Sequence, residues 1–442
     1  MTETLVRTVQ QARDGLTSAL FTLIALLMNL WQLARPKGFI FDEVYYAKNA
    51  HSLVTHGVEL QSNGSAEFIV HPPIGKWIIG IGIKAFGFNE FGWRFSAAFI
   101  GALSVGLIFF VAKRFFDSYF LASTASFLTL LDGIHLVHSR TALLDIFLMF
   151  FILLSFYLIL RNQPWLAAIT IGLALATKWS GIYYMVAFAG FLLYSDYREE
   201  KAMENERPIR AVLIHSLWKR FTQFFLIPIA TYLASWTGWF VTKNGWDRNW
   251  SHSIVKSFLH YHAEMWNFHT HLTEGHSYSA NPWSWLIMGR PTSFFYASPK
   301  GCGATSCSQE ILALGTPFIW WSGVIALAVT CGYWLARREW QSGLILLSMA
   351  AGYLPWFLIQ KRTMFTFYAI TFEPFLILAI IFALSKFLER NESGEIPRFR
   401  LYAVCGYLGA VVVNFWYFSP LFFGSVITYS AWFHRMWIPS WI

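Results

Sequence analysis

The sequence predicts an all-α polytopic membrane protein with about eleven transmembrane helices and two long outer loops. Of the 442 residues, 56% are hydrophobic and 13% are charged, whereas soluble domains are about 25% charged. The mean hydropathy is +0.46. These values argue against a soluble enzyme. The high apolar content, with 19% aromatic residues, also excludes a disordered chain.

Apolar runs of helical length predict the helices, and the whole chain, 1–442, is expected to form one domain. The segment 336–442 supplies its C-terminal helices. Two runs are weak spans, because 164–177 is short and 118–134 ends in polar residues from Asp132. Residues 75–90 are apolar but contain Lys84, which favours an interfacial or re-entrant helix. In chain order the runs are 16–34, 94–112, 118–134, 142–160, 164–177, 179–195, 222–242, 311–335, 341–359, 364–387 and 400–423.

The distribution of basic residues predicts the orientation. The first run follows Arg7 and Arg13 and lacks a small-residue cleavage site, so we expect a retained span with a cytoplasmic N-terminus. Short loops on that side are basic, as the positive-inside rule requires. Eleven spans then place the C-terminus and the long loops 35–93 and 243–310 outside a plasma membrane. The net charge of +9 fits anionic lipid in such a protein, and we expect no nucleic-acid partner.

The acid pair Asp42–Glu43 directly follows the first span and has aromatic neighbours. Most acid pairs in loops are simply solvated. Here the aromatic side chains are expected to desolvate at least one carboxylate, which raises its pKa and makes it a better base. Adjacent side chains point in different directions. We therefore expect one acid to react and the other to orient it or bind substrate.

Cationic residues at predicted outer helix ends supply positive charge on the same face as Asp42. Each alone could reach to the interface as a snorkelling side chain. Together they suit a phosphate group, for which Arg offers bidentate contacts. Asp145 and Asp132 flank Arg140, so either could form an ion pair with it or take part in catalysis. The cations are Arg94, Arg140, Lys178, Lys361 and Arg362.

These residue types fit the transfer of a sugar from a lipid phosphate. The phosphate is already a good leaving group, so no general acid is needed, in contrast to two-carboxylate glycosidases. One carboxylate takes the proton of an acceptor hydroxyl, and cations stabilise charge on the departing phosphate. A single displacement would invert the anomeric centre.

Histidine and cysteine residues leave smaller questions open. His71 precedes two prolines and could serve the site or cap a helix. A cluster of five histidines in the second loop, from His260 to His276, leaves a divalent metal ion as an alternative. No Cys/His ligand spacing is met, so we predict no metal site and no obligatory cofactor. The outer compartment is oxidising, which makes a disulfide between Cys302 and Cys307 plausible.

Several motifs resemble the protein O-mannosyltransferase family, and together they span nearly the whole chain in order. The ending is similar to that of the actinobacterial members. Other lipid-linked sugar transferases share the acid pair, so the later motifs are more specific. The motifs are Phe41-Asp42-Glu43, His71-Pro72-Pro73-Ile74-Gly75-Lys76, His138 to Asp145, His276-Ser277-Tyr278, Asn281-Pro282-Trp283-Ser284-Trp285, Arg290-Pro291, Leu354-Pro355-Trp356, Lys361 to Phe365, and Arg435 to Ile442.

The resemblance implies a type-C glycosyltransferase (GT-C) fold and mannose transfer from polyprenyl-phosphate-mannose to Ser or Thr of secreted or translocating proteins, with inversion. Asp42 carries over as the base and Glu43 as its neighbour. The same comparison favours Arg94, Arg140, Lys361 and Arg362 for the donor phosphate, and His71, His276 and Asp145 as acceptor or orienting residues. The secretion translocon is an expected partner. Eukaryotic members insert a β-trefoil domain into the second loop, which is too short for it here.

Two other functions fit part of the pattern. A related GT-C enzyme that glycosylates a lipid, such as an aminoarabinose transferase, would share the acid pair and the cations, but the tryptophan motif of the second loop argues against it. A lipid-linked sugar transporter would need broken helices near the midplane and repeat symmetry. The sequence shows neither of these features.

Overall fold

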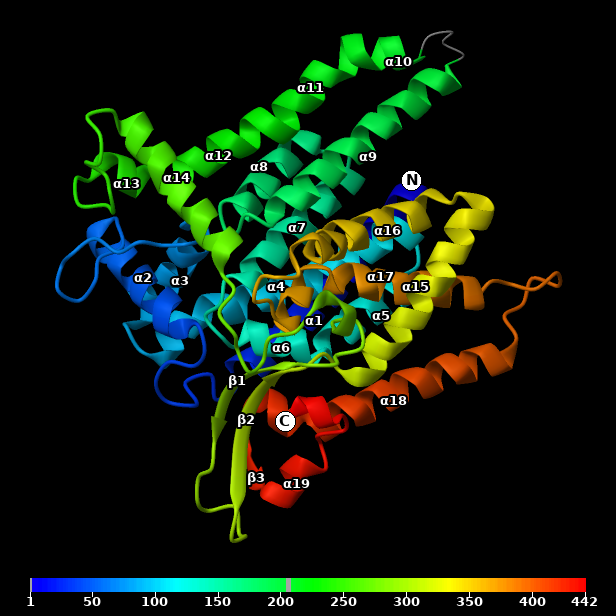
Figure 1. Ribbon diagram of the computed structural model, residues 1–442. Helices are drawn as coiled ribbons and strands as arrows, with labels where there is room; N and C mark the ends of the chain where they lie inside the picture. The colour runs from blue at the N-terminus through cyan, green and yellow to red at the C-terminus, as the bar shows by residue number, and fades with distance from the viewer. Residues whose placement is uncertain (1, 204–207) are drawn as a thin grey trace.

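Each apolar run contains a helical segment in the computed structural model, which describes residues 2–203 and 208–442 (Figure 1). The first residues of the run 311–335, however, lie in a β-strand. The long helices are α1 (Thr2–Leu30), α4 (Glu90–Phe116), α9 (Gly181–Ala202), α15 (Pro317–Arg337) and α18 (Arg398–Phe423). Shorter apolar helices lie between them: α5 (Tyr119–Leu130), α6 (Gly133–Ser139), α7 (Asp145–Leu160), α8 (Pro164–Leu175), α16 (Trp340–Tyr353) and α17 (Glu373–Phe387). The predicted run 222–242 belongs to a nearly continuous helix formed by α10 (Pro208–Ala211), α11 (Leu217–Phe221), α12 (Ile227–Ser235) and α13 (Thr237–Val241) with two π-helical segments.

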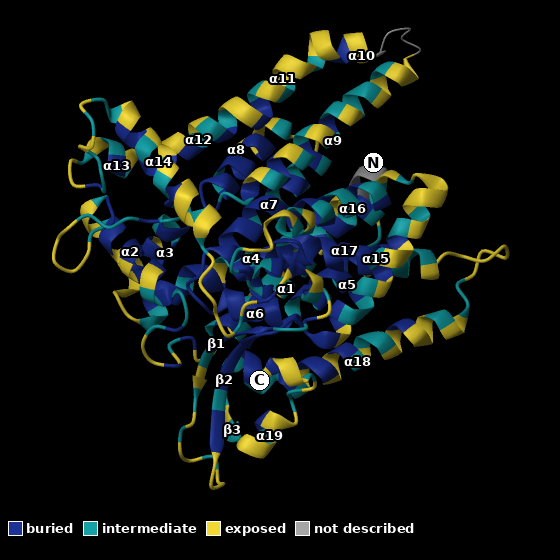
Figure 2. Cartoon of the chain, viewed as in Figure 1, coloured by how far each residue is buried: buried dark blue, intermediate teal, exposed yellow. Residues whose placement is uncertain are grey.

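The helices α4, α7 and α17 form the centre of the bundle, while α10 to α12 and α18 expose much of their surface (Figure 2). Within the described residues, four helices are long and apolar enough to cross a membrane, namely α4, α15, α16 with its 3-10 extension to Ile359, and α18. A fifth is counted if α5 and α6 together form one span. The structure therefore supports a membrane protein, and the number of eleven spans stays a prediction.

A bend of 64° separates α5 from α6, and it explains why the run 118–134 was weak as a straight span. Gly133 begins α6 at a place with no room for a side chain, because a Cβ there would lie 2.4 Å from the carbonyl oxygen of Leu314. The buried Asp132 accepts hydrogen bonds from the Thr316 backbone and the Trp320 indole. The bend thus joins α6 to the start of α15.

The first predicted outer loop contains two helices, α2 (Glu43–His56) and α3 (Ile74–Phe86). The second contains α14 (Ile254–His271) and part of a small antiparallel sheet of β1 (Thr292–Ala297), β2 (Cys307–Ala313) and β3 (Val426–Thr428), in the order β1-β2-β3. A short helix, α19 (Tyr429–Phe433), follows β3 near the C-terminus (Figure 1). The prediction of an all-α protein was therefore incomplete. The sheet is formed by residues 292–313 and 426–428, which are far apart in sequence, and period-3.6 patterning does not detect such pairing.

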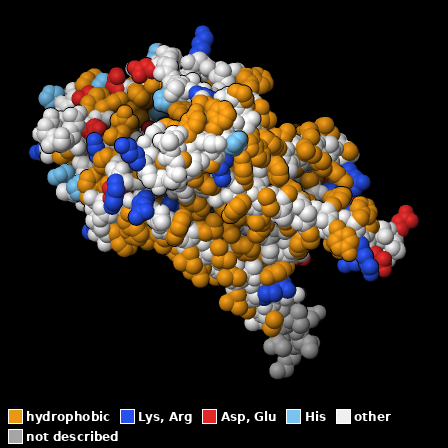
Figure 3. Space-filling view, turned by 90° about the horizontal axis from the view of Figure 1, so that it is seen from below, with side chains coloured by type: hydrophobic (Ala, Val, Ile, Leu, Met, Phe, Trp, Pro, Cys, Tyr) orange, Lys and Arg blue, Asp and Glu red, His pale blue; other side chains and the backbone are white. Residues whose placement is uncertain are grey.

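The two long loops pack against each other. The Tyr261 hydroxyl accepts a hydrogen bond from the Ile69 backbone at 3.0 Å, and His269 Nε2 donates to the Val70 carbonyl at 2.6 Å. The segment after α16 contacts the second of these loops, since the backbone of Thr363 donates a hydrogen bond to the Leu272 carbonyl at 3.0 Å. Viewed from below, histidine and many charged side chains gather toward the upper left of the molecule, a smaller charged group lies at the right, and hydrophobic side chains cover the broad area between them (Figure 3). The bundle thus supports a polar assembly built from both loops.

Candidate active site

Asp42 occupies the N-cap position of α2, with φ −72° and ψ −1°. An Asp at this position usually accepts a hydrogen bond from the first turn of its helix. The Asp42 side chain makes no such capping bond. In the part of the chain that the structure describes, its carboxylate accepts no hydrogen bond at all, and the side chain is only partly buried. It is therefore an acceptor left available to a substrate.

The surroundings of Asp42 alter its proton affinity. Loss of hydration on burial raises the pKa of Asp42 to about 6, Lys178 acts in the opposite direction, and Asp145 adds to the rise. A carboxylate with this pKa is still largely ionised at neutral pH and is a stronger base than an ordinary Asp. This agrees with the effect expected from its aromatic neighbours.

Glu43, by contrast, is fully buried and fully bonded. Both carboxylate oxygens pair with the Arg94 guanidinium at 2.8 Å. They also accept hydrogen bonds from the backbones of Ile40 and Ala142, each at 3.0 Å. Glu43 therefore ties the start of α2 to α4 and to the turn before α7, and the structure distinguishes two acids that the sequence left interchangeable.

Arg94 was expected to contact the donor phosphate, but the structure gives all five of its N–H groups other partners. Besides Glu43, they donate to the carbonyls of Leu33, Pro36 and Gly38 at 3.0 to 3.1 Å. The side chain is 0% exposed. Its phosphate assignment is therefore replaced by a structural one, because no donor remains to face a ligand.

Arg140 also has protein partners. Its Nη1 donates to carbonyls at the end of α1, with the shortest bonds, 2.7 Å, to Asn29 and Trp31. The guanidinium lies 5.0 Å from the ring centre of Phe423. Such contacts suit the C-terminal end of a helix, where carbonyl groups lack intrahelical donors. These hydrogen bonds engage only the Nη1 nitrogen of the Arg140 guanidinium.

Lys178 is the cation that the structure places beside Asp42, although sequence reasoning had noted it only as one of several cations at helix ends. Its ammonium donates to both oxygens of Asp145, at 2.8 and 3.0 Å. The same ammonium lies 5.3 Å from the Tyr368 ring centre. An ion pair of Asp145 with Arg140 was one of two alternatives for this acid, and the structure instead pairs Asp145 with Lys178 from the turn after α8. The two residues are 33 positions apart, so spacing in the sequence could not reveal the pair.

Arg362 is the second cation near this group. Its Nε donates to the His269 carbonyl at 3.2 Å, and its charge acts on Tyr46 and His71. Lys361 is exposed on the same segment. Arg362 and Lys178 thus share the surroundings of His71, in the region that also contains Asp42.

His71 and His269 form a pair of neutral imidazoles, with ring centres 5.1 Å apart. Burial and then the charge of Lys178 hold the pKa of His71 well below its usual value. Burial is also the main cause that lowers the pKa of His269 to about 4. Neutral imidazoles can both donate and accept hydrogen bonds, so this pair can bind hydroxyl groups without adding charge.

The remaining predicted residues lie outside this group or serve locally. His276 is exposed and accepts a hydrogen bond from the Tyr278 backbone at 3.1 Å. Cys302 and Cys307 are joined by a disulfide at the tip of the β1–β2 hairpin. The described residues show no group of three His, Cys, Asp or Glu that could hold a metal ion.

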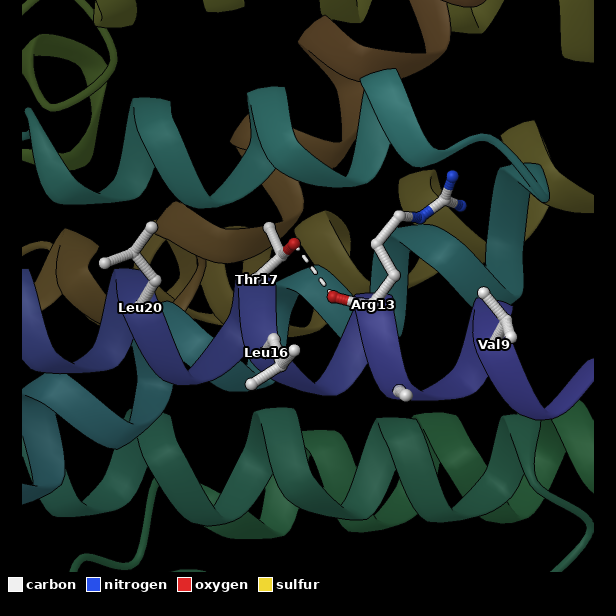
Figure 4. Close-up of a pocket in the computed structure, with 6 residues that line it drawn as sticks. Val9, Arg13, Leu16, Thr17 and Leu20 are labelled. Atoms are coloured by element: carbon white, nitrogen blue, oxygen red, sulfur yellow. Dashed lines mark hydrogen bonds between the residues drawn. The ribbon is translucent and has the colours of Figure 1, made fainter.

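A surface hollow of about 420 Å³ lies on the N-terminal half of α1, at the other end of that helix from Asp42. Val9, Leu16 and Leu20 line it, with Thr17 donating to the Arg13 carbonyl at 2.9 Å (Figure 4). Its lining is almost entirely apolar and shares no residue with the Asp42 group. The chemistry of the candidate site therefore rests on the polar residues around Asp42.

Comparison with known sequences finds similarity along the whole chain. The profile of a family described as dolichyl-phosphate-mannose-protein mannosyltransferase matches residues 19–240, and that of the C-terminal four-transmembrane region of protein O-mannosyltransferase matches 254–441. A polyprenol-phosphate-mannose–protein mannosyltransferase of Mycobacterium tuberculosis is 32% identical, over 98% of this chain and 93% of the relative. A protein of the same name from Corynebacterium glutamicum is 30% identical, over 96% and 92%.

Solved structures share the architecture. The yeast protein O-mannosyltransferase Pmt1–Pmt2 complex bound to its sugar donor aligns with a TM-score of 0.81 at 16% identity, covering 97% of this chain and 93% of that one. ArnT from Cupriavidus metallidurans, bound to undecaprenyl phosphate, gives a TM-score of 0.59 at 15% identity and covers 92% and 76%. An Archaeoglobus fulgidus oligosaccharyltransferase gives 0.55 at 13% identity, covering 93% and 56%. The fold is therefore that of GT-C glycosyltransferases.

Proposed function

The chain belongs to the protein O-mannosyltransferase family, and we propose on this premise that it transfers mannose from polyprenyl-phosphate-mannose to Ser or Thr hydroxyls of exported proteins. The names of its relatives supply the donor and the protein acceptor. The observation that carries the proposal is the Asp42 carboxylate. Among the described residues it accepts no hydrogen bond, its pKa is raised to about 6, and the charge of Lys178 acts on it.

The transfer needs one base and a stabilised leaving group. Asp42 takes the proton of the acceptor hydroxyl while the oxygen of that hydroxyl attacks the anomeric carbon of mannose. The bond from that carbon to the phosphate oxygen breaks, and polyprenyl phosphate leaves with the electron pair. Attack from the face opposite the phosphate inverts the anomeric configuration. A raised pKa strengthens the base and still leaves it ionised at neutral pH.

Positive charge for the leaving phosphate comes from Lys178 and Arg362, with Lys361 adding charge from an exposed position. Asp145 holds the Lys178 ammonium in place. We assign His71 and the exposed His276 to the acceptor side, and the neutral imidazole of His71 can bind a hydroxyl there. Glu43 and Arg94 contribute indirectly. Their buried ion pair fixes the start of α2 and hence the backbone of Asp42.

The membrane setting follows from the same proposal. The N-terminus lies in the cytoplasm, while the active site and the C-terminus lie outside the plasma membrane. A donor lipid reaches the site from the bilayer, and an acceptor protein reaches it from the outer side as it leaves the secretion translocon.

Purified protein supplied with polyprenyl-phosphate-mannose and a Ser/Thr-rich peptide tests the proposal. We expect mannose on the peptide, and a loss of at least about a hundredfold in turnover for Asp42→Asn, because the amide cannot accept the proton. Asp117→Asn is the matched control, since this exposed acid lies at the end of α4. Mannose found on a lipid and not on the peptide, or full turnover by Asp42→Asn, would contradict the proposal.

A further inference from the structure

Phe41, the residue before Asp42, has an unusual backbone conformation. Its φ is 45°, in the left-handed region that bulky side chains rarely adopt. The Glu43 amide donates to the Ile40 carbonyl at 3.0 Å, so residues 40–43 form a hydrogen-bonded turn. A positive φ at Phe41 followed by −72° and −1° at Asp42 is the pattern of a type II′ turn. The first central position of that turn is ordinarily glycine.

An aromatic cage holds this conformation. The Phe41 ring stacks on Phe294, with ring centres 4.6 Å apart and an angle of 9° between their planes. Phe365 and Phe367 meet the Phe41 ring edge-on, at 6.1 and 5.4 Å. Such unfavourable backbone conformations persist only where their surroundings over-determine them, and they gather at active sites.

The partner ring is also placed by an irregularity. The pairing of β1 with β2 passes from Ser293 opposite Leu312 to Phe295 opposite Ile311, which leaves Phe294 without a partner across the ladder. A bulge of this kind redirects a side chain and is frequent next to active sites. Phe294 is 3% exposed and lies against Phe41. Phe41 and Phe294 therefore stack on each other from irregular backbone positions, a positive φ at Phe41 and a β-bulge at Phe294.

The turn has a direct effect on Asp42. It ends at the first residue of α2 and sets the direction in which the N-cap side chain leaves the backbone. That side chain makes no capping bond, although Asp is among the residues best suited to one. Holding the Asp42 carboxylate away from the helix end keeps it available for an acceptor hydroxyl.

We infer that Phe41 is a positioning residue for sugar transfer, and that its stacking on the bulged Phe294 locks the turn that presents the Asp42 carboxylate to the acceptor. This inference rests on the proposed function. The loop 35–93 supplies the turn, and the loop 243–310 supplies the Phe294 ring that holds the turn in place. A purely structural Phe41 would contribute to stability and leave the turnover of the folded enzyme unchanged.

Kinetics of purified variants separates these roles. Phe41→Gly keeps a residue suited to the turn but removes the ring, and Phe294→Leu removes the stacking partner. We expect both to lower kcat at least about tenfold, with KM for the donor within about twofold, since misplacement of a reacting group by about 1 Å is costly. Phe41→Tyr keeps a six-membered ring and should restore turnover. Phe295→Leu, one residue along β1, is the matched control and should resemble the wild type.

A pH profile gives a second readout that stability alone would not move. Without the lock the Asp42 carboxylate becomes better hydrated or caps α2, so its pKa falls from about 6 and the midpoint of the acid limb moves to lower pH. This shift is measurable on partly active variants, and thermal melting of each variant identifies any that fail to fold. If Phe41→Gly misfolds, Phe294→Leu carries the same test.

Three outcomes would overturn the inference. Wild-type kcat and an unmoved midpoint of the acid limb in folded Phe41→Gly or Phe294→Leu would show that the aromatic cage contributes only to packing. If Asp42→Asn is inactive in the same assays, the proposed function still stands. A rise in KM with unchanged kcat would assign the ring to substrate binding. Wild-type turnover by Asp42→Asn would instead remove the proposed function and this inference together.

Discussion

Adjacent residues with the same charge take opposite environments in this protein. The Asp42 carboxylate accepts no hydrogen bond from the described part of the chain, whereas that of Glu43 accepts hydrogen bonds from Arg94 and from backbone amides. The sequence predicts that one of the pair reacts and the other orients it. The local residue pattern could not say which, and only the family resemblance favoured Asp42, because the distinction depends on an arginine 51 residues from Glu43.

The pH dependence of turnover should follow the charges around Asp42. The base must be ionised, so kcat/KM should fall as the pH drops through about 6. Lys178 lowers the pKa of Asp42 and Asp145 raises it. Lys178→Met should therefore move the midpoint to higher pH, and Asp145→Asn should move it to lower pH. Initial rates with saturating donor between pH 4.5 and 8 would measure both shifts, and shifts in the same direction would contradict the assignment.

Arg362 should contribute to donor affinity. Loss of a hydrogen bond to a charged group costs about 1.5–3 kcal/mol, so Arg362→Ala should weaken binding of polyprenyl phosphate by that amount, as measured by titration calorimetry in detergent. Lys361→Ala should weaken it less, because Lys361 is exposed. Unchanged affinity in Arg362→Ala would remove this residue from the phosphate site.

At the level of elements, one buried ion pair joins α2 to α4. Removing one partner of such a pair costs about 3–5 kcal/mol, so Arg94→Met should lower the thermal stability of the detergent-solubilised protein markedly. The folded fraction should keep its donor affinity, because no N–H of Arg94 faces a ligand. Lys113→Met, which breaks a pair with the exposed Asp117, should leave stability unchanged. A stable Arg94→Met protein with weakened donor binding would restore the phosphate assignment.

Sequence patterning predicts the helices better than their irregularities. The runs 142–160 and 400–423 match α7 and α18 closely. The predicted span 364–387 instead begins with a 3-10 segment, Thr366–Thr371, and becomes α-helical at Glu373. That segment belongs to the assembly of the two long loops, since the residues just before it, Thr363 and Met364, form backbone hydrogen bonds with the loop 243–310. Phe367 in this segment and Phe365 just before it belong to the aromatic cage around Phe41, which explains why this stretch resembles a span in sequence.

At the level of the whole molecule, the candidate site is assembled from segments that are distant in sequence. Asp42, His71 and Arg362 were singled out from local motifs, and the structure brings them into one region. Two further pairs form only when the turn after α8 and helix α14 pack into this region. They are Lys178 with Asp145, and His269 with His71. Local motifs can identify reactive residue types, but not the pairing of charges that tunes them.

We expect the positive charge of Lys178 and Arg362 to take the place of a divalent cation in the proposed reaction. We expect turnover to persist in excess EDTA, because protein cations stabilise the departing phosphate. Assays before and after chelation, followed by addition of Mg²⁺ or Mn²⁺, would measure this. Loss of activity that is restored by metal would contradict it.

The unbonded carboxylate at the start of α2 also suggests a route to inhibitors. A peptide carrying an amino group in place of the serine hydroxyl would bring an ammonium ion to the position of the transferred proton. It would form an ion pair with ionised Asp42 and lose that attraction once the acid is protonated. Such a peptide should therefore compete with acceptors most strongly above pH about 6.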